Sequence, residues 1–316
     1  MRSPPPSAYF LVGPTAVGKT ALAHALALEM GADLLSADSM LVYRGLDLGT
    51  AKPTAAERAV IRYAGIDLVS PDAGFHVAAY AAHAADFLAQ ARAGGRPVLV
   101  VGGTGLYVQC LLAGLAPRPP ADPAWRSAAE ALLAQHGRGA LQDLLRQLDA
   151  ARFQALTESD RQNPRRLIRA VELARATNQL SPSQPPTPAG PPLVGLRCPP
   201  ALHWERIQAR VQSMYEQGLL EEARRLRAAF PGWSATARQA IGYAEALDAL
   251  DGRCTVAAAQ QRTALRTRQL AKRQMTWFRH QARVVWVDVS ADATVPELAA
   301  RVRGLWNAHG PSPTFY

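Results

Sequence analysis

Cysteine is scarce in this chain, and the three that occur, Cys110, Cys198 and Cys254, are far apart. They form no CxxC pair, so the sequence predicts neither a zinc site nor a disulfide framework. Long apolar runs are also missing: no stretch approaches about 18 consecutive apolar residues, the length of a membrane-spanning helix. The N-terminal segment lacks the apolar core of a signal peptide. We therefore expect a cytoplasmic protein with reduced thiols.

Acidic side chains are absent from one long segment. Residues 252–287 contain no Asp or Glu, whereas the basic residues there are Arg253, Arg262, Arg266, Arg268, Lys272, Arg273, Arg279 and Arg283. A solvated helix normally mixes charges of both signs, and a helix of one sign repels itself unless a polyanion lies against it. Together with a net charge of +10, this indicates a nucleic-acid partner. The alternative is a compositional habit of an Arg-rich chain.

Short apolar runs alternate with helical segments in the first part of the chain. Alternation of this kind indicates a parallel α/β sheet, and runs without internal alternation are typical of strands buried on both faces. We predict strands at residues 9–12, 34–37, 66–69, 97–101, 193–197 and 284–287, and helices at 20–30, 77–92, 202–229, 238–250, 255–281 and 295–307.

The pattern changes between these two halves of the sheet. From residue 121 to about 178 the periodicity is helical and no convincing strand occurs, and a proline-rich stretch follows at 181–192. The predicted fold is α/β: a P-loop NTPase-like parallel sheet core formed by residues 1–117 and 193–316, with an all-helical insertion domain over residues 118–192.

A phosphate-binding motif follows the first predicted strand. The residues that match G-x-x-x-x-G-K-[ST] are Gly13, Pro14, Thr15, Ala16, Val17, Gly18, Lys19 and Thr20. Backbone N–H groups of such a loop and the following helix N-terminus surround phosphate oxygens. Lys19 places an ammonium on the outer phosphates, and Thr20 offers a hydroxyl ligand for Mg²⁺. The motif does not distinguish ATP, GTP or another diphosphate.

Two polar residues follow the ends of other strands. In an open parallel sheet the carboxyl ends of strands face the ligand crevice, so Asp38 should lie near the P-loop. Its role could be general base, Mg²⁺ ligand through water, or turn cap. Thr104, in GGTGLY, could hydrogen-bond a bridging or leaving oxygen, or cap a helix. No Asp ends this strand, which weakens an interpretation as a nucleotide hydrolase.

Basic pairs and clusters occur elsewhere. Arg206 and Arg210 share a helix face and could clamp a diphosphate, or pair with Glu205. The insertion carries its own basic cluster, which favours docking of an RNA stem through its phosphates. A base that reacts at its edge must leave its stack, and the aromatic residues that could receive it are Tyr43, Tyr107 and Trp125; core packing is the alternative for each.

The order of six motifs resembles the tRNA dimethylallyltransferase (tRNA isopentenyltransferase) family. They are LVGPTAVGKT, SADSMLVYRGLDLGTAKP, VGGTGLY, NPRRLIRAVE, RQAIGY and TRQLAKRQMTWFR, and they extend from about Tyr9 to Val287. The resemblance implies transfer of a dimethylallyl group from dimethylallyl diphosphate to N6 of adenine 37, in tRNAs that read codons beginning with U. It also implies Mg²⁺, the tRNA anticodon stem-loop as partner, and a monomer that needs no protein partner.

The resemblance also implies roles for individual residues. Asp38 would be the general base, Thr104 would contact the reacting region, and Lys19, Thr20 and Arg206 would hold the leaving diphosphate. The residues that fall where the family contacts tRNA are Asp38, Ser39, Met40, Leu41, Thr104, Arg126, Gln162, Asn163, Pro164, Arg165, Arg166, Arg238, Gln239, Ala240, Ile241, Gly242 and Tyr243.

Three other functions are compatible with parts of the sequence. A P-loop small-molecule kinase explains the phosphate motif but not the segment without acidic residues. A prenyltransferase acting on free adenine nucleotides would need no basic insertion. A non-catalytic RNA-binding module leaves Lys19, Thr20 and Asp38 without a purpose.

Overall fold

The computed structural model describes residues 7–115, 122–176 and 191–316. The chain divides into two compact units, residues 1–114 with 187–316, and residues 115–186. Most of the proline-rich stretch 181–192, and the expected domain boundary between residues 117 and 118, lie outside the described residues.

The strands of the first unit form one sheet, in the order β3-β2-β4-β1-β5-β6, and these six strands are all parallel. β7 pairs antiparallel with β1 at Ser7–Pro313. All four residues of β2 are buried, as the apolar run predicts for a strand covered on both faces. The predicted parallel α/β core is therefore confirmed. The strands are β1 (Ser7–Val12), β2 (Asp33–Ser36), β3 (Tyr63–Ala64), β4 (Val98–Gly102), β5 (Leu193–Arg197), β6 (Val284–Asp288) and β7 (Ser312–Pro313).

The strand predicted at residues 66–69 is wrong. The strand at this edge is β3, Tyr63–Ala64, and Val69 makes only an isolated bridge to Tyr43. Gly65 and Asp67 have φ angles of 75° and 56°, in the left-handed region. A strand needs extended backbone, so these two residues interrupt it.

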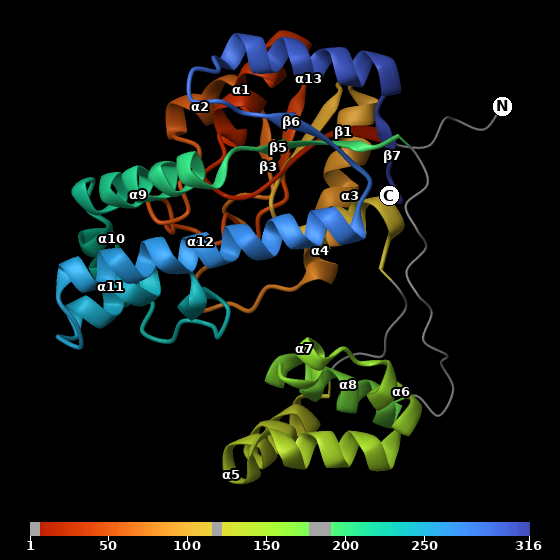
Figure 1. Cartoon of the computed structure of the whole chain (residues 1–316), viewed down its shortest axis with the longest axis vertical. Coiled ribbons are helices and arrows are strands. Elements are labelled where there is room, and N and C mark those ends of the chain that lie inside the picture. Colours follow the sequence, from red (N-terminus) through yellow and green to blue (C-terminus); the bar gives the residue numbers. More distant parts are fainter. Residues whose placement is uncertain (1–6, 116–121, 177–190) are drawn as a thin grey trace. The chain divides into compact units, whose positions relative to one another are not determined.

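Helices cover both faces of the sheet (Figure 1). Buried residues of α1 and α13 pack with one face, and those of α3 and α4 pack with the other. A further group, α9 to α12, packs together, with α12 in contact with α4, α9 and α11. The helices of this unit are α1 (Lys19–Met30), α2 (Ala55–Val60), α3 (Val77–Ala93), α4 (Gly105–Ala113), α9 (Pro200–Glu216), α10 (Leu219–Ala229), the 3-10 helix η1 (Ala237–Gln239), α11 (Tyr243–Leu250), α12 (Val256–Gln281) and α13 (Val295–His309).

The second unit is helical throughout its described residues. Its core, which includes Leu141, Leu145, Leu167 and Val171, lies mainly between α5 and α8. Gly137, with a φ of 74°, kinks α5. The helices are α5 (Pro123–Leu148), α6 (Ala150–Ala155), α7 (Glu158–Arg161) and α8 (Pro164–Ala176).

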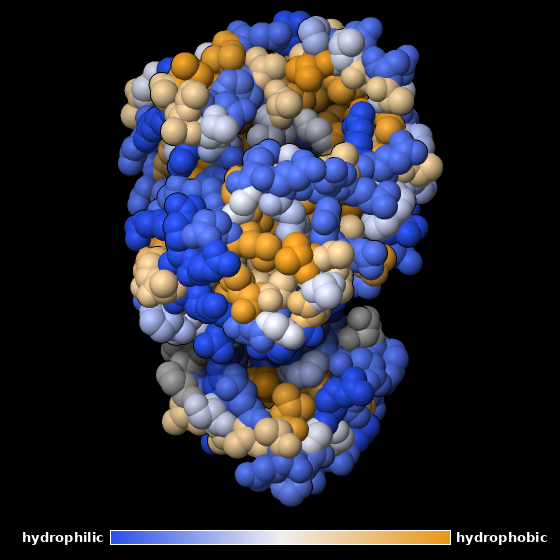
Figure 2. All heavy atoms as spheres, turned by 90° about the vertical axis from the view of Figure 1, so that its left-hand side faces the viewer, coloured by the Kyte–Doolittle hydropathy of each residue, from blue (hydrophilic) through white to orange (hydrophobic). Residues whose placement is uncertain are grey.

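The molecular surface is largely polar on the face seen in Figure 2, where apolar side chains gather only in limited patches among hydrophilic ones. Across the part of the chain that the structure describes, every helix is too short or too polar to span a bilayer.

Candidate functional site

The turn between β1 and α1 adopts a conformation that requires glycine. Gly13 has a φ of 140°, and a Cβ there would lie 2.5 Å from the backbone oxygen of Leu196 on β5. Gly18, with a φ of 103°, immediately precedes Lys19, the first residue of α1. The motif thus forms a P-loop that ends at a helix N-terminus, the arrangement that binds phosphate.

Two distant helices hold this loop in place. The Thr15 N–H donates to Oε1 of Gln274 on α12 at 2.8 Å. Nε2 of His203 on α9 lies 2.8 Å from the Thr15 carbonyl oxygen, which can only accept, so Nε2 carries the proton. Burial lowers the pKa of His203. The sequence analysis assigned neither residue a role: His203 lies outside the six motifs, and Gln274 lies within TRQLAKRQMTWFR, but that motif does not show which of its side chains reaches the P-loop.

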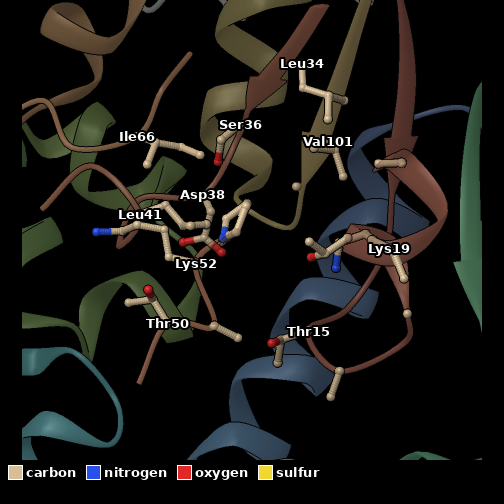
Figure 3. Close-up of a pocket in the computed structure, with 18 of the residues that line it drawn as sticks. Thr15, Lys19, Leu34, Ser36, Asp38, Leu41, Thr50, Lys52, Ile66 and Val101 are labelled. Atoms are coloured by element: carbon tan, nitrogen blue, oxygen red, sulfur yellow. The ribbon is translucent and has the colours of Figure 1, made fainter. Parts of the chain in front are cut away.

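A cavity of about 440 Å³ opens beside the P-loop. Figure 3 shows Thr15, Lys19, Asp38 and Thr50 around it. Within the described residues its walls combine the P-loop, the end of β2 and α9. The sequence-predicted residues that line it are Thr15, Ala16, Gly18, Lys19, Thr20, Asp38, Leu41 and Arg206, and Arg210 joins them. Such a volume is typical of a small-molecule site.

The cations of the cavity are partly stripped of water. Burial lowers the pKa of Lys19 to about 7, an effect that Asp38 opposes and Arg210 reinforces. Burial also lowers the pKa of Arg210, again against the attraction of Asp38. The Lys19 ammonium donates to the Pro14 carbonyl oxygen at 2.6 Å. A bound anion stabilises the charged form of such partly desolvated cations.

The two arginines on α9 bind backbone oxygens. Arg206 donates to the carbonyls of Val17 and Ser290, each at 3.3 Å, and Arg210 donates to the carbonyl of Thr50 at 3.1 Å. In the described part of the chain neither forms a salt bridge with Glu205 or another carboxylate. Both guanidinium groups line the cavity and remain charged for a diphosphate.

Asp38 both caps a turn and lines the cavity. Its Oδ1 accepts from the Met40 N–H at 2.8 Å. Thr104 does not line the cavity, and its side chain does not cap α4. Instead its hydroxyl accepts from the Ser39 N–H at 3.1 Å, and its own N–H donates to the Ala37 carbonyl at 3.0 Å. Thr104 therefore fixes the segment that carries Asp38.

Lys52 is a buried cation that the sequence analysis did not single out. Its side chain is 1% exposed. Its ammonium donates to the Tyr43 carbonyl at 2.8 Å, to Asp47 at 2.6 Å and to Asp67 at 2.7 Å. These bonds close the loop that carries Thr50 along one wall of the cavity. Asp47, the other carboxylate near Asp38 in sequence, is thus part of an ion-pair network.

The oxygen donors of the cavity suit magnesium. The Thr20 side chain and the Asp38 carboxylate both line it. Among the described residues no group of three His, Cys, Asp or Glu side chains could hold a metal by itself. Mg²⁺ fits this arrangement, because it binds through few protein ligands and takes the others from phosphate oxygens and water.

The RQAIGY segment is only partly accessible. Arg238 and Gln239 are exposed and Ile241 is half-buried, whereas Ala240, Gly242 and Tyr243 are buried. The Tyr243 hydroxyl donates to the carboxylate of Glu222 and accepts from the Gly49 N–H at 3.1 Å. The ring of Tyr243 therefore supports the loop from inside. Ser39, Met40 and Leu41 are half-buried.

The basic residues of the second unit are largely engaged within it. Arg126 forms a two-point ion pair with buried Glu172, at 2.8 and 3.1 Å, and Arg169 joins Glu172 at 2.8 Å. Arg166 pairs with Asp160. Asn163 caps α8 by accepting from the N–H groups of Arg165 and Arg166, Pro164 begins that helix, and Gln162 donates to Glu158.

Of the two readings of the candidate aromatic residues, core packing holds for Tyr43 and Tyr107. Tyr43 is fully buried, and Tyr107 stacks on Tyr80 with ring centroids 3.8 Å apart. Trp125 is half-buried and lies under Arg175, whose guanidinium carbon is 3.9 Å from the ring centroid.

Several basic residues of the segment without acidic residues form ion pairs with carboxylates from outside it. α11 supplies carboxylates to α12: Asp248 pairs with Arg262 at 2.7 Å, and Glu245 pairs with Arg266. Asp248 and Asp251 also neutralise Arg253, at 2.6 and 2.8 Å. A polyanion is therefore not needed along the first half of this helix.

Comparison with known proteins gives one consistent result. The model of the family described as IPP transferase matches residues 41–281. A tRNA dimethylallyltransferase of Anaeromyxobacter dehalogenans (strain 2CP-C) is 43% identical over 296 residues, which cover 92% of this chain and 97% of the relative. One from Deinococcus radiodurans is 43% identical over 281 residues, 86% of this chain and 89% of the relative.

A solved structure has the same fold. The full-length tRNA isopentenylpyrophosphate transferase from Bacillus halodurans aligns with a TM-score of 0.68 at 35% identity, covering 96% of this chain and 97% of the other.

Proposed function

The chain belongs to the IPP transferase family, and on that premise we propose that it transfers a dimethylallyl group from dimethylallyl diphosphate to N6 of adenine 37 in tRNAs that read codons beginning with U. The relatives that match nearly the whole length of the chain are named for prenyl transfer to tRNA.

One observation carries the proposal: a single cavity combines the P-loop cations with the carboxylate of Asp38. Lys19, Arg206 and Arg210 provide the positive charge that a diphosphate needs, and two of them are desolvated. Asp38 provides a proton acceptor at the same place. A kinase could also use both features, so the choice of prenyl transfer rests in addition on the names of the relatives.

The reaction follows from this arrangement. The bond between the allylic C1 and the diphosphate oxygen breaks, and a bond between C1 and N6 of adenine forms. The N6 proton passes to the Asp38 carboxylate. Negative charge develops on the departing diphosphate, where Lys19, Thr20 and Arg206 stabilise it electrostatically, and the enclosed site holds the reactants in line.

Magnesium is proposed as the cofactor. The Thr20 hydroxyl would ligate it directly and Asp38 would do so through water, while the diphosphate provides further oxygens. When bound, Mg²⁺ neutralises part of the leaving-group charge. The role of Asp38 as base does not depend on the metal.

The tRNA side of the proposal uses residues with different accessibility. Asp38–Leu41, with Thr104 behind them, would meet the extruded adenine, and Arg238 and Gln239 would contact the anticodon loop. Residues 118–192, with Gln162–Arg166 and Arg126, would dock the stem. As the family resemblance implies, we also propose that the protein acts as a monomer, and that it acts on tRNA in the cytoplasm.

The test is prenyl transfer to a defined RNA. The purified protein with Mg²⁺ and labelled dimethylallyl diphosphate should label an anticodon stem-loop, and should not label one in which adenine 37 is replaced by guanine. Labelling of free AMP instead, or turnover of ATP without RNA, would refute the proposal.

A further inference from the structure

The cavity beside the P-loop has two chemically different ends. Figure 3 shows Leu34 and Val101 extending away from Thr15 and Thr50, with Asp38 and Lys19 between them. The end near Thr15 carries the cations described above. The other end is lined mainly by apolar side chains of α1, the loop after β3 and the neighbouring strands, and it also includes Ser36 and the carboxylate residue Glu57 of α2.

The apolar end is a slot on the α1 face of the sheet. Side chains two residues apart on a strand share a face, so Leu34 and Ser36 lie on the same wall, and Asp38, two residues after the end of β2, also lines the cavity. Strand pairing sets Tyr63 beside Leu34 and Val101 beside Ser36. We call this the apolar slot; its residues are Ala23, Leu34, Tyr63, Ile66 and Val101.

Tyr63 lines the slot and is paired with Leu34, the β2 residue of the slot that is farther from Asp38 in sequence. Its hydroxyl is hydrogen-bonded to Nδ1 of His24 on α1, with 3.0 Å between the two atoms. Burial raises the pKa of Tyr63 to about 12, so the phenol keeps its proton. Tyr63 and His24 are half-buried. The bond joins the edge of the sheet to α1 and holds the ring across the slot.

Ala23 makes room on the opposite wall. It is a buried residue of α1, and it lies one turn after Thr20, which faces the phosphate end of the same cavity. A larger side chain at this position would enter the space between α1 and Leu34.

Resting on the proposed function, we propose that the dimethylallyl group lies in the apolar slot and that the Tyr63 ring closes it, which limits the transferred group to five carbons. The charged and apolar parts of dimethylallyl diphosphate match the two ends of the cavity. Its diphosphate would lie at the P-loop, its reacting carbon near Asp38, and its short branched hydrocarbon in the slot. A ten-carbon geranyl chain would have to pass the position of the Tyr63 ring.

The experiment compares two donors on the anticodon stem-loop, dimethylallyl diphosphate and geranyl diphosphate. The wild-type protein should use the first and discriminate against the second. Tyr63→Ala should raise the ratio of kcat/KM for geranyl over dimethylallyl diphosphate about tenfold or more. Tyr63→Phe, which keeps the ring and loses the bond to His24, should keep the preference for five carbons.

A second variant fills the slot from α1. Ala23→Val should raise the KM for dimethylallyl diphosphate about tenfold. The affinity of this variant for inorganic pyrophosphate, measured by calorimetry, should stay within about twofold of the wild-type value. Pyrophosphate binding also reports whether each variant is folded.

The outcomes separate this inference from the proposed function. If the wild-type protein transfers the five-carbon group and Tyr63→Ala keeps its full preference for it, the slot assignment is wrong and the function stands. If Tyr63→Ala does not fold, Ala23→Val decides: an unchanged KM for dimethylallyl diphosphate overturns the assignment. No transfer by the wild-type protein to any stem-loop refutes the proposed function itself.

Discussion

Gln274 on α12 accepts a hydrogen bond from the backbone N–H of Thr15 in the P-loop, with 2.8 Å between nitrogen and oxygen. The two residues are 259 positions apart in sequence. The phosphate-binding loop is therefore held by the same long helix that carries the basic segment of the chain, and its shape depends on how that helix packs.

This bond predicts a defect in donor binding when Gln274 is changed. Gln274→Met keeps the length of the side chain but removes the acceptor, and the Thr15 N–H loses its partner. We expect the KM for dimethylallyl diphosphate to rise about tenfold, in line with the loss of one partly buried hydrogen bond. Gln261→Met, at an exposed position of α12, is the matched control. Equal KM values for the two variants would contradict the role of Gln274.

Asp38 can be tested with its turn intact. In Asp38→Asn the side-chain oxygen can still accept from the Met40 N–H, but the amide cannot take a proton. We expect kcat to fall by about 10²–10⁴-fold. tRNA affinity, measured by filter binding, should stay within about twofold. A parallel loss of affinity and turnover would mean that Asp38 organises the RNA site rather than removing the N6 proton.

Diphosphate binding should be coupled to a proton. The free protein has a Lys19 pKa of about 7 because the ammonium is buried, and a bound diphosphate raises that pKa by attracting the charged form. Between the two pKa values the complex holds more protons than the free protein, so affinity falls as pH rises above about 7.

Calorimetry with pyrophosphate at pH 8, in buffers of different ionisation enthalpy, should show proton uptake. In Lys19→Arg the side chain keeps its charge at every pH used. Any protons exchanged on binding to this variant therefore come from pyrophosphate itself and serve as the reference. The same uptake in both proteins would exclude Lys19 as the titrating group.

The bond between Tyr243 and Glu222 should contribute to stability. Burial raises the pKa of Glu222, and the Tyr243 hydroxyl opposes that rise by donating to its carboxylate. Tyr243→Phe leaves the carboxylate without this donor and the Gly49 N–H without its acceptor. We expect the free energy of unfolding to fall by about 1–3 kcal/mol, measured in urea. An unchanged midpoint would show that water replaces the hydroxyl.

The sequence was informative where chemistry is local. The P-loop and Asp38 are short patterns at strand ends, and a parallel sheet must bring strand ends together. The roles of Lys52, His203 and Gln274 were missed, although Lys52 and Gln274 lie within quoted motifs, because the partners of a side chain are set by packing and not by its motif. The strand at 66–69 was misplaced because Asp67, in a left-handed conformation, interrupts an otherwise apolar run.

The ion-pair partners of a segment and the burial of a side chain were also not predictable from the sequence. The segment 252–287 has no acidic residue of its own, but its partners come from α11, which precedes it in the chain. Tyr243 belongs to a polar motif and is nevertheless fully buried. Pairing between helices and the depth of a side chain are tertiary properties, and neither can be read from a linear pattern.

The most direct measurement is a crystal structure of the protein with Mg²⁺, an anticodon stem-loop and a non-hydrolysable analogue of dimethylallyl diphosphate. We expect the diphosphate on the P-loop against Lys19 and Arg206, the hydrocarbon toward Leu34 and Tyr63, and the adenine N6 between C1 and the Asp38 carboxylate. An analogue bound elsewhere, or an adenine that does not reach Asp38, would contradict this expectation.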